Sequence, residues 1–273
     1  MSATAQPDLP AIKAKQQQTW ASGDYAAIAA KMQLVSERLV DAGDFPAGAR
    51  VLDVAGGSGN AALAAARAGC EVVCTDYVPT LLERARERAE AERLALEVRE
   101  GDAEALPFED ASFDAVISVV GVMFAADQER AARELLRVCR PGGTIALASW
   151  TPDDFVADMF RTVSTHVPPP AGLQPPVRWG SEEGLSQLIG DGVTDIRHAP
   201  RVYTWRFRSP ERFVEFFRDH YGPTHKAFAA LDGADEGALY ADLVQLVRRF
   251  DRRTDDAVAV PATYLETIAT RSD

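Results

Sequence analysis

The stretch VLDVAGGSGN, residues 51–60, joins an apolar strand-like run to a loop with three glycines. The alanine-rich segment that follows is typical of a helix, and Gly69 marks its end. A glycine loop that follows a strand and opens a helix is typical of a nucleotide cofactor site. The loop alone leaves two classes open, namely nicotinamide-dependent hydride transfer and methyl transfer from S-adenosylmethionine.

Short apolar runs alternate with helical segments along most of the chain. This alternation predicts an α/β fold with a doubly wound, mostly parallel sheet. Seven runs have the pattern of strands, at residues 49–55, 71–77, 96–103, 113–122, 142–150, 193–207 and 256–271.

Three parts can be distinguished along the sequence. Residues 1–44 form the first part, where helical periodicity predicts an N-terminal helical cap or lid. Residues 45–150 hold the alternating core, and residues 151–273 are expected to complete the sheet and to insert helices as a substrate lid. The expected helices outside the core are 11–42, with a break near 22–24, and 182–190, 210–220 and 236–252. The proline-rich segment 166–180 is expected to be a loop.

Composition and charge argue against several classes of protein. The 273 residues carry a net charge of −12, which repels the phosphates of nucleic acids, so a small-molecule substrate is expected. No run of about 18 apolar residues predicts a membrane span. Three cysteines without a CxxC motif favour a reducing compartment and a cytoplasmic location. The four histidines lack metal-ligand spacing, so no metal is expected, and both a monomer and a homodimer remain open.

Two aspartates near the glycine loop bear on the choice of cofactor. Asp76 ends the second strand, where a carboxylate accepts hydrogen bonds from ribose hydroxyls in both classes. Asp53 lies at the end of the first strand, where its charge would repel a pyrophosphate and attract a cationic ligand. S-adenosylmethionine carries an ammonium and a sulfonium and no phosphate, so Asp53 favours that cofactor.

Five motifs in order resemble those of the class I S-adenosylmethionine-dependent methyltransferases. They are VLDVAGGSG, TDY, GDAEALPF, FDAVIS and LLRVCRPGGTIALASW, all within residues 51–150. This segment is similar to the ubiquinone/menaquinone-biosynthesis branch with its type 11 methyltransferase domain, and the whole chain resembles an actinobacterial subgroup. The resemblance implies a Rossmann-like fold with a seven-stranded sheet. Ala55 stands where the family often has glycine.

The resemblance also implies where the parts of the cofactor lie. The methionine moiety would contact the glycine loop, the ribose would contact the end of the second strand, and the adenine would contact the end of the third. The cofactor ammonium would bond to a backbone carbonyl at the end of the fourth strand. Two aromatic residues of the N-terminal segment could fold over the cofactor. In chain order, these candidates are Trp20, Tyr25, Asp53, Ala55, Gly56, Gly57, Gly59, Asp76, Tyr77, Asp102, Ala103 and Ser118.

Methyl transfer needs an aligned nucleophile and a dry site, and it needs a base only if the nucleophile must lose a proton. We therefore expect in-line methyl transfer to a small metabolite, at oxygen first and at nitrogen or carbon next. The alternatives are an NAD(P)-dependent oxidoreductase and a catalytically inactive S-adenosylmethionine-binding protein. The remaining candidate residues are Met123, Trp150 and Trp179 for the substrate pocket and His220, Tyr221 and His225 for a general base.

Overall fold

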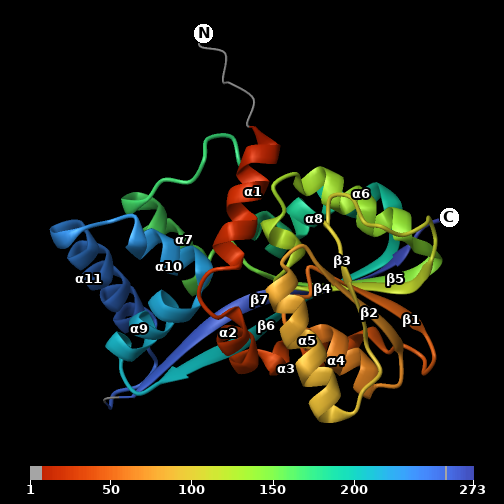
Figure 1. The fold of residues 1–273 in the computed structure, drawn as a ribbon, viewed down its shortest axis with the longest axis horizontal. Coiled ribbons are helices and arrows are strands. Elements are labelled where there is room, and N and C mark those ends of the chain that lie inside the picture. The colour runs from red at the N-terminus through yellow and green to blue at the C-terminus, as the bar shows by residue number, and fades with distance from the viewer. Residues whose placement is uncertain (1–7, 256) are drawn as a thin grey trace, which may run out of the picture.

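Strand β1 (Arg50–Val54) lies inside a seven-stranded sheet, as expected for the run that precedes the glycine loop. The computed structural model describes residues 8–255 and 257–273. The strand order is β3-β2-β1-β4-β5-β7-β6, with helices on both faces, which confirms the predicted doubly wound sheet (Figure 1). The other strands are β2 (Glu71–Asp76), β3 (Glu97–Glu100), β4 (Phe113–Val119), β5 (Cys139–Trp150), β6 (Val193–Phe207) and β7 (Val258–Arg271).

The sheet is mostly parallel, as predicted. Strand β1 pairs in parallel with β2 and β4, whereas β7 runs antiparallel to both of its neighbours, β5 and β6. The chain proceeds from β1 outward to β3 and then returns to place β4 on the other side of β1. Such a reversal opens a crevice at the carboxyl ends of the strands, which is where open α/β sheets bind ligands.

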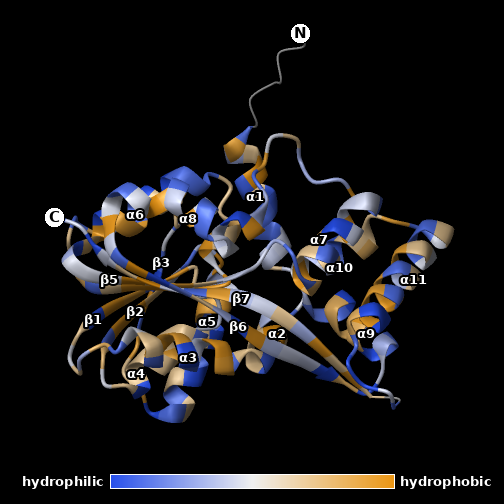
Figure 2. Cartoon of the chain, turned by 180° about the vertical axis from the view of Figure 1, so that it is seen from behind, coloured by the Kyte–Doolittle hydropathy of each residue, from blue (hydrophilic) through white to orange (hydrophobic). Residues whose placement is uncertain are grey.

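Helices on the two faces bury the central strands. Figure 1 shows α3 (Gln33–Gly43), α4 (Asn60–Arg67) and α5 (Pro79–Glu92) on one face and α6 (Gln128–Val138) and α8 (Glu182–Ile189) on the other. Strands β1 and β2 are mostly orange in Figure 2, as expected for strands that are covered on both sides. The short side chains of α4, buried from residue 60 to residue 65, let this helix pack close to the sheet.

The N-terminal cap consists of α1 (Leu9–Trp20), α2 (Tyr25–Lys31) and α3. The predicted break near 22–24 is present, and a second break falls at Met32; the first seven residues of the predicted cap lie outside the described residues. Gly23 has a φ of +72°, and a Cβ there would lie 2.7 Å from the backbone oxygen of His220. The amide of Asp24 donates to that same oxygen at 3.0 Å, so the break is anchored on the C-terminal part.

The C-terminal part contains more helix than the sequence predicted. Helices α8, α9 (Pro210–His220) and α11 (Gly233–Phe250) match the three expected helices within a few residues. However, α7 (Phe155–His166) and α10 (Gly222–Ala229) were not predicted, and residues 176–180 form a short 3-10 helix in the segment expected to be a loop. Pro223 is compatible with α10 because it lies in the first turn, where its missing N–H has no helical partner anyway.

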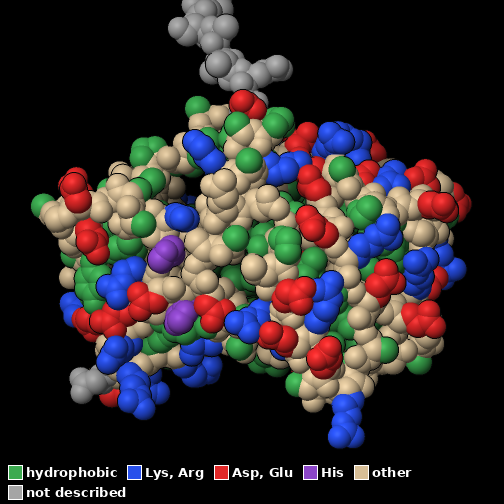
Figure 3. All heavy atoms as spheres, in the orientation of Figure 1, with side chains coloured by type: hydrophobic (Ala, Val, Ile, Leu, Met, Phe, Trp, Pro, Cys, Tyr) green, Lys and Arg blue, Asp and Glu red, His purple; other side chains and the backbone are tan. Residues whose placement is uncertain are grey.

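The surface carries charges of both signs. Figure 3 shows acidic and basic side chains interspersed over the face that it presents. Within residues 8–255 and 257–273, no helix has both the length and the apolar character that a bilayer crossing requires.

Candidate active site

A cavity of about 650 Å³, partly open to solvent, lies at the carboxyl ends of β1, β2 and β4. Its wall is made by α1, by the glycine loop, by the ends of β2 and β3, and by the segment that follows β4, all between residues 13 and 126. We call it the first cavity. It occupies the crevice that the strand order opens.

The glycine loop forms one side of the first cavity through Ala55 and Gly57. Ala55 adopts a φ of +53°, which costs a residue with a side chain about 1–2 kcal/mol. Gly59 has a φ of +81°, and a Cβ there would lie only 2.9 Å from the Cβ of Ala85 on α5. Glycine at position 59 therefore lets α5 pack against the loop and fixes the loop's shape.

Asp76, at the end of β2, lies on the wall of the first cavity and is tied to the loop. One carboxylate oxygen accepts the amide hydrogen of Gly57 at 2.9 Å, and the other accepts that of Val78 at 2.9 Å. Burial raises the pKa of Asp76 to about 6, although these backbone hydrogen bonds oppose the shift. The carboxylate is thus held rigidly where a ribose hydroxyl could donate to it.

Asp53 lies behind the loop and not on the cavity wall. Its Oδ2 accepts the amide hydrogen of Ala62 at 2.9 Å, and its Oδ1 has no hydrogen-bond partner among the described residues. Burial raises the pKa of Asp53 to about 7; the Ala62 amide opposes this shift and the charge of Asp76 adds to it. The carboxylate of Asp53 therefore anchors the first turn of α4, and its contact with the methionine moiety stays a prediction.

Three more cofactor candidates lie beneath the wall of the first cavity. The hydroxyl of Ser118 donates to the carbonyl of Val54 at 2.7 Å and accepts the amide hydrogen of Val122 at 3.0 Å. These bonds of the hydroxyl tie the end of β4 to β1 and to the next turn, and the predicted contact of the Ser118 carbonyl with the cofactor ammonium stays a prediction. Gly56 and Gly59 also do not line the cavity, because they face Asp53 and α5 respectively.

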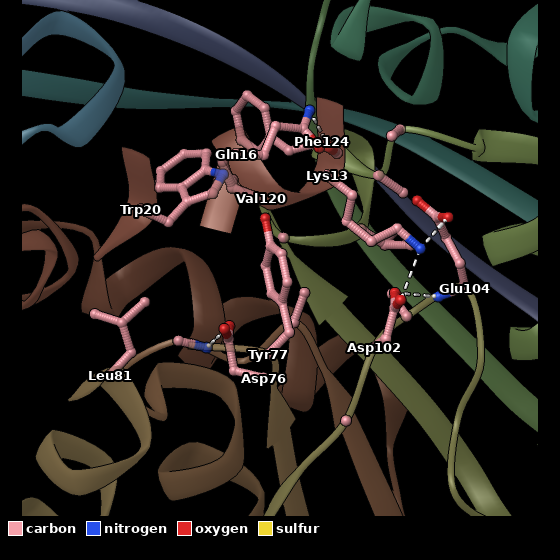
Figure 4. A pocket seen from close by; sticks show the side chains of 18 of the residues that line it. Lys13, Gln16, Trp20, Asp76, Tyr77, Leu81, Asp102, Glu104, Val120 and Phe124 are labelled. Carbon is pink, nitrogen blue, oxygen red and sulfur yellow. Dashed lines mark hydrogen bonds and ion pairs between the residues drawn. The ribbon is translucent and has the colours of Figure 1, made fainter. Parts of the chain in front are cut away.

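At the opposite end of the first cavity, a lysine from α1 meets two acidic residues (Figure 4). The Nζ atom of Lys13 lies 2.7 Å from Oδ2 of Asp102 and 2.5 Å from Oε2 of Glu104. Partial burial lowers the pKa of Lys13, but the hydrogen bonds to both carboxylates raise it to a net value above normal. Asp102 and Ala103, which were predicted to contact the adenine, both lie on the wall of the first cavity. The ion pair with Lys13 occupies one carboxylate oxygen of Asp102.

Helix α1 covers the first cavity with one face. Lys13, Gln16 and Trp20 all line the cavity, and Figure 4 shows them pointing toward it. The side-chain amide of Gln16 donates to the carbonyl of Phe124 at 3.2 Å, and the Trp20 ring packs edge-on against Phe124 at 4.9 Å between centroids. Sequence reasoning missed Lys13 and Gln16, although their spacing from Trp20, seven and four residues, places all three on one helix face.

A smaller second cavity of about 360 Å³ adjoins the first. Both cavities share three wall residues, Tyr25, Val120 and Phe124. The rest of its wall is apolar or aromatic and includes two of the predicted residues, Trp150 and Tyr221. Seen from the first cavity, the second one lies behind Tyr25 and Phe124, toward α7 and α9.

The other residues predicted for the substrate pocket or as general bases line neither cavity. Met123 and Trp179 are fully buried in the core and line neither cavity. His220 packs on the ring of Phe216, with 4.7 Å between centroids, and Nδ1 of His225 lies 3.1 Å from the carbonyl oxygen of Arg218. These four residues line neither cavity, and their roles as pocket residues or bases stay predictions.

Val120, on the wall between the two cavities, has a φ of +51°. A β-branched residue in this conformation is strained, and such strain costs about 1–3 kcal/mol. The backbone is held there by a hydrogen bond from the amide of Val120 to the carbonyl of Ala148 at 2.8 Å. The next residue, Gly121, approaches Ala55 so closely that a Cβ would lie 2.3 Å from the Ala55 oxygen.

Comparison with known proteins gives the family. Residues 52–147 match the family described as methyltransferase domain. An uncharacterized protein of Mycobacterium tuberculosis is 44% identical over 227 residues, which is 82% of each chain. A demethylmenaquinone methyltransferase of Deinococcus radiodurans is 36% identical over 171 residues, or 61% of this chain and 71% of that one. The chain belongs to the S-adenosylmethionine-dependent methyltransferases.

The expected branch and fold are confirmed for this methyltransferase. The Deinococcus relative supports the ubiquinone/menaquinone-like type 11 branch, and the mycobacterial relative is actinobacterial. The solved structure of the YcgJ protein of Bacillus subtilis has the same fold, with a TM-score of 0.61 at 18% identity, over 87% of the methyltransferase and 98% of that chain. S-adenosylmethionine is the cofactor of the family and of this methyltransferase.

The wall of the first cavity fits this cofactor. The methyltransferase places three carboxylates on the wall, those of Asp76, Asp102 and Glu104, which suit ribose hydroxyls and a cationic ligand. Lys13 is the one cation among the described wall residues, and it is already paired with two of the carboxylates. A pyrophosphate would therefore find repulsion here, which argues against the oxidoreductase alternative. Within the described residues, no three side chains of His, Cys, Asp or Glu gather as metal ligands would.

Proposed function

We propose that this methyltransferase methylates a small molecule that is bound in the second cavity. The observation that carries the proposal is the shared wall of Tyr25, Val120 and Phe124, which brings the two cavities together. The second cavity is smaller than the first and is lined by residues of α2, α7 and α9 and of strands β5 and β6, which suits a free metabolite better than a segment of a macromolecule.

The side chains of the protein contribute mainly by aligning the bound molecules and by excluding water from the site. When bound, the cofactor would supply an activated methyl group on a cationic sulfur, and the acceptor would supply the electron pair for the new bond. Trp20 and Phe124 shield the first cavity, and exclusion of water with correct alignment lowers the barrier of such a reaction by several kcal/mol.

The acceptor atom is oxygen in our first proposal, with nitrogen and carbon as alternatives. The hydroxyls of Tyr25 and Tyr221 are the titratable groups on the described wall of the second cavity. Burial raises the pKa of both tyrosines, so they stay protonated at neutral pH and do not act as bases. An acceptor oxygen would therefore be that of an acidic hydroxyl, because the described wall of the second cavity provides no strong base to deprotonate an alcohol.

Parallel titrations of the purified chain with S-adenosylmethionine, S-adenosylhomocysteine and NADH test the proposal. We expect binding of the first two and none of NADH, followed by transfer of a labelled methyl group to compounds from a metabolite extract. Binding of NADH alone would support an oxidoreductase. Binding of both sulfur compounds without transfer to any acceptor would support the inactive binding protein.

A further inference from the structure

We propose that Arg88, on α5, is a positioning residue of the cofactor site, which holds the glycine loop and α2 in fixed relative positions. The inference goes beyond the proposed function, because it concerns the donor side of the site and stands whichever acceptor is bound. Three observations support it. They are the hydrogen bonds of Arg88 to the loop, the link from the loop to α2, and the neutral character of every oxygen that Arg88 binds.

One face of α5 lies against the site. Leu81 lines the first cavity, and a Cβ on Gly59 would lie 2.9 Å from the Cβ of Ala85, one turn further along. Arg88 follows at helical spacing, so these three residues of α5 share one face. Neither Arg88 nor Ser58 lines the first cavity, so the contact between them is made behind the cavity wall.

The guanidinium of Arg88 joins the loop to the neighbouring helices. Its Nη1 donates to the carbonyl of Ser58 and to Oδ1 of Asn60, both at 2.7 Å, and its Nη2 donates to Oε1 of Gln33 at 2.8 Å. Gln33 closes this cluster, because its Nε2 donates to the carbonyl of Asn60 at 3.3 Å. The cluster therefore connects α3, the glycine loop, the start of α4 and α5.

The loop is held on both sides of the residue that forms the cavity wall. Gly57 lines the first cavity with a φ of +56°. Asp76 accepts its amide hydrogen at 2.9 Å, and Arg88 donates to the carbonyl of the next residue at 2.7 Å. Glycine can adopt many backbone conformations, so the bonds that flank it select this one. Arg88 thus helps to fix the shape of the surface that the cofactor contacts.

Asn60 extends the effect to α2. Its Nδ2 donates to the carbonyl of Ala29 at 2.7 Å, and the residue is only 8% exposed. Four residues before Ala29, the ring of Tyr25 lies against Gly57, where a Cβ would be 3.4 Å from Cε1 of the tyrosine. Tyr25 lines both cavities. A displaced cluster would therefore shift the aromatic residue that lies between them.

The partners of Arg88 differ from those of the other arginines on α5. Arg84 and Arg86 are exposed and pair with glutamates of the same helix. Among the described residues, the half-buried Arg88 forms no ion pair and binds neutral carbonyl, amide and hydroxyl oxygens. Hydrogen bonds from a charged donor are stronger than those between neutral groups. Such bonds suit a group that fixes backbone and amide oxygens in place.

Calorimetric titration of the full chain with S-adenosylhomocysteine tests the inference. For Arg88→Met, which removes every donor of the guanidinium, we expect the affinity to fall roughly tenfold. Arg88→Lys keeps the charge but reaches only part of the cluster, so we expect a smaller loss of about threefold. Arg84→Met is the matched control, because the Arg84 side chain bonds to Glu87 at the surface of the same helix and should not affect the affinity.

Urea unfolding of each variant without ligand separates positioning from stability. A structural role alone would lower the free energy of unfolding of Arg88→Met but leave the folded variant with wild-type affinity, and that result would overturn the inference. If Arg88→Met does not fold, the lysine variant gives the same test. Wild-type affinity in Arg88→Lys would then overturn the inference, whereas a loss of about threefold would support it.

A double-variant cycle tests the path through α2. If Arg88 acts in part through Tyr25, the two side chains support one interaction with the cofactor. The loss of affinity in the double variant Arg88→Met, Tyr25→Ala should then be at least about threefold smaller than the product of the two single losses. A combined loss equal to that product would show that Arg88 does not act through α2.

Discussion

Lys13 and Asp102 are separated by 89 residues in the chain, yet their charged groups lie 2.7 Å apart on the wall of the first cavity. The contact joins the covering helix α1 to the loop after β3, at the position where the adenine is expected. The first cavity is thus covered by a helix that is fastened through an ion pair.

Removal of this ion pair should weaken the attachment of helix α1 over the first cavity. For Lys13→Met we expect S-adenosylhomocysteine to dissociate roughly fivefold faster, equivalent to about 1 kcal/mol, because α1 loses its bonds to Asp102 and Glu104. Stopped-flow displacement measures the rate. Lys15→Met is the control, because Lys15 lies two residues away on the exposed side of α1. Similar rates for the two variants would show that the ion pair does not hold the cover.

Asp76 should matter for cofactor affinity. In Asp76→Asn, one of the two backbone amides loses its acceptor, and the proposed bond to a ribose hydroxyl is weakened. We expect the binding free energy of S-adenosylhomocysteine to fall by about 1–3 kcal/mol in calorimetry. Asp114→Asn is a suitable control, because Asp114 also accepts a backbone amide hydrogen, from Arg50, but away from both cavities. An unchanged affinity in the Asp76 variant would remove this role.

Asp53 should make the stability of the protein depend on pH. Its native pKa of about 7 lies above that of an unfolded aspartate, so the native state binds more protons between about pH 4 and pH 7. The free energy of unfolding contributed by this group therefore decreases as the pH rises through that window. Relative to wild type, Asp53→Asn should gain roughly 2–3 kcal/mol between about pH 5 and pH 8 in denaturant unfolding. Parallel pH curves for the two proteins would contradict this.

Because the backbone of Val120 is strained, replacing this valine by glycine should cost less stability than the same replacement at an unstrained position. Val120→Gly removes buried methyl groups but also relieves the left-handed backbone, whereas Val116→Gly removes similar groups from a regular position in β4. We expect urea unfolding to show a loss at position 120 that is smaller by about 1 kcal/mol or more. A loss at position 120 as large as that at position 116 would mean that the strain is not there to be relieved.

The three candidate bases should separate in kinetic measurements. Tyr221 lines the second cavity, whereas His220 and His225 do not, so Tyr221→Phe should change acceptor KM while His220→Ala and His225→Ala leave it unchanged. Because burial raises the pKa of Tyr221, its removal should not alter the pH profile of kcat near neutrality. The measurement uses the true acceptor with a labelled methyl donor. Loss of the acidic limb, the fall of kcat at low pH, in either histidine variant would support the general-base hypothesis.

Much of the fold followed from periodic patterns in the sequence. The seven strands and the helices of the core have short apolar runs or helical spacing, and all of them could be predicted. Helix α7 was missed, although Phe155, Val156, Met159 and Phe160 recur at helical spacing after the capping Asp154. Helix α10 begins at the Gly222-Pro223 pair, which resembles a turn in sequence, so only packing against α9, α1 and α7 identifies it as a helix.

The candidate site was predictable where residues close in sequence form it. The glycine loop and Asp76 are local to the first two strands, and both lie on the first cavity as expected. The pairing of Lys13 with Asp102 joins segments far apart in the chain and leaves no local pattern. The direction of a side chain is equally hidden, since Trp150 and Trp179 look alike in sequence but only Trp150 reaches the second cavity.

The two cavities draw on different stretches of the chain. The first cavity takes its described wall from residues 13–126, whereas seven of the twelve wall residues of the second come from the stretch Trp150–Tyr221. Under the proposed function, the donor side of the site is therefore encoded before residue 127, whereas most of the acceptor wall is encoded after residue 149. An exchange of residues 150–221 between relatives would then alter most of the acceptor wall and leave the donor wall intact, which gives protein engineers a crossover point for chimeras.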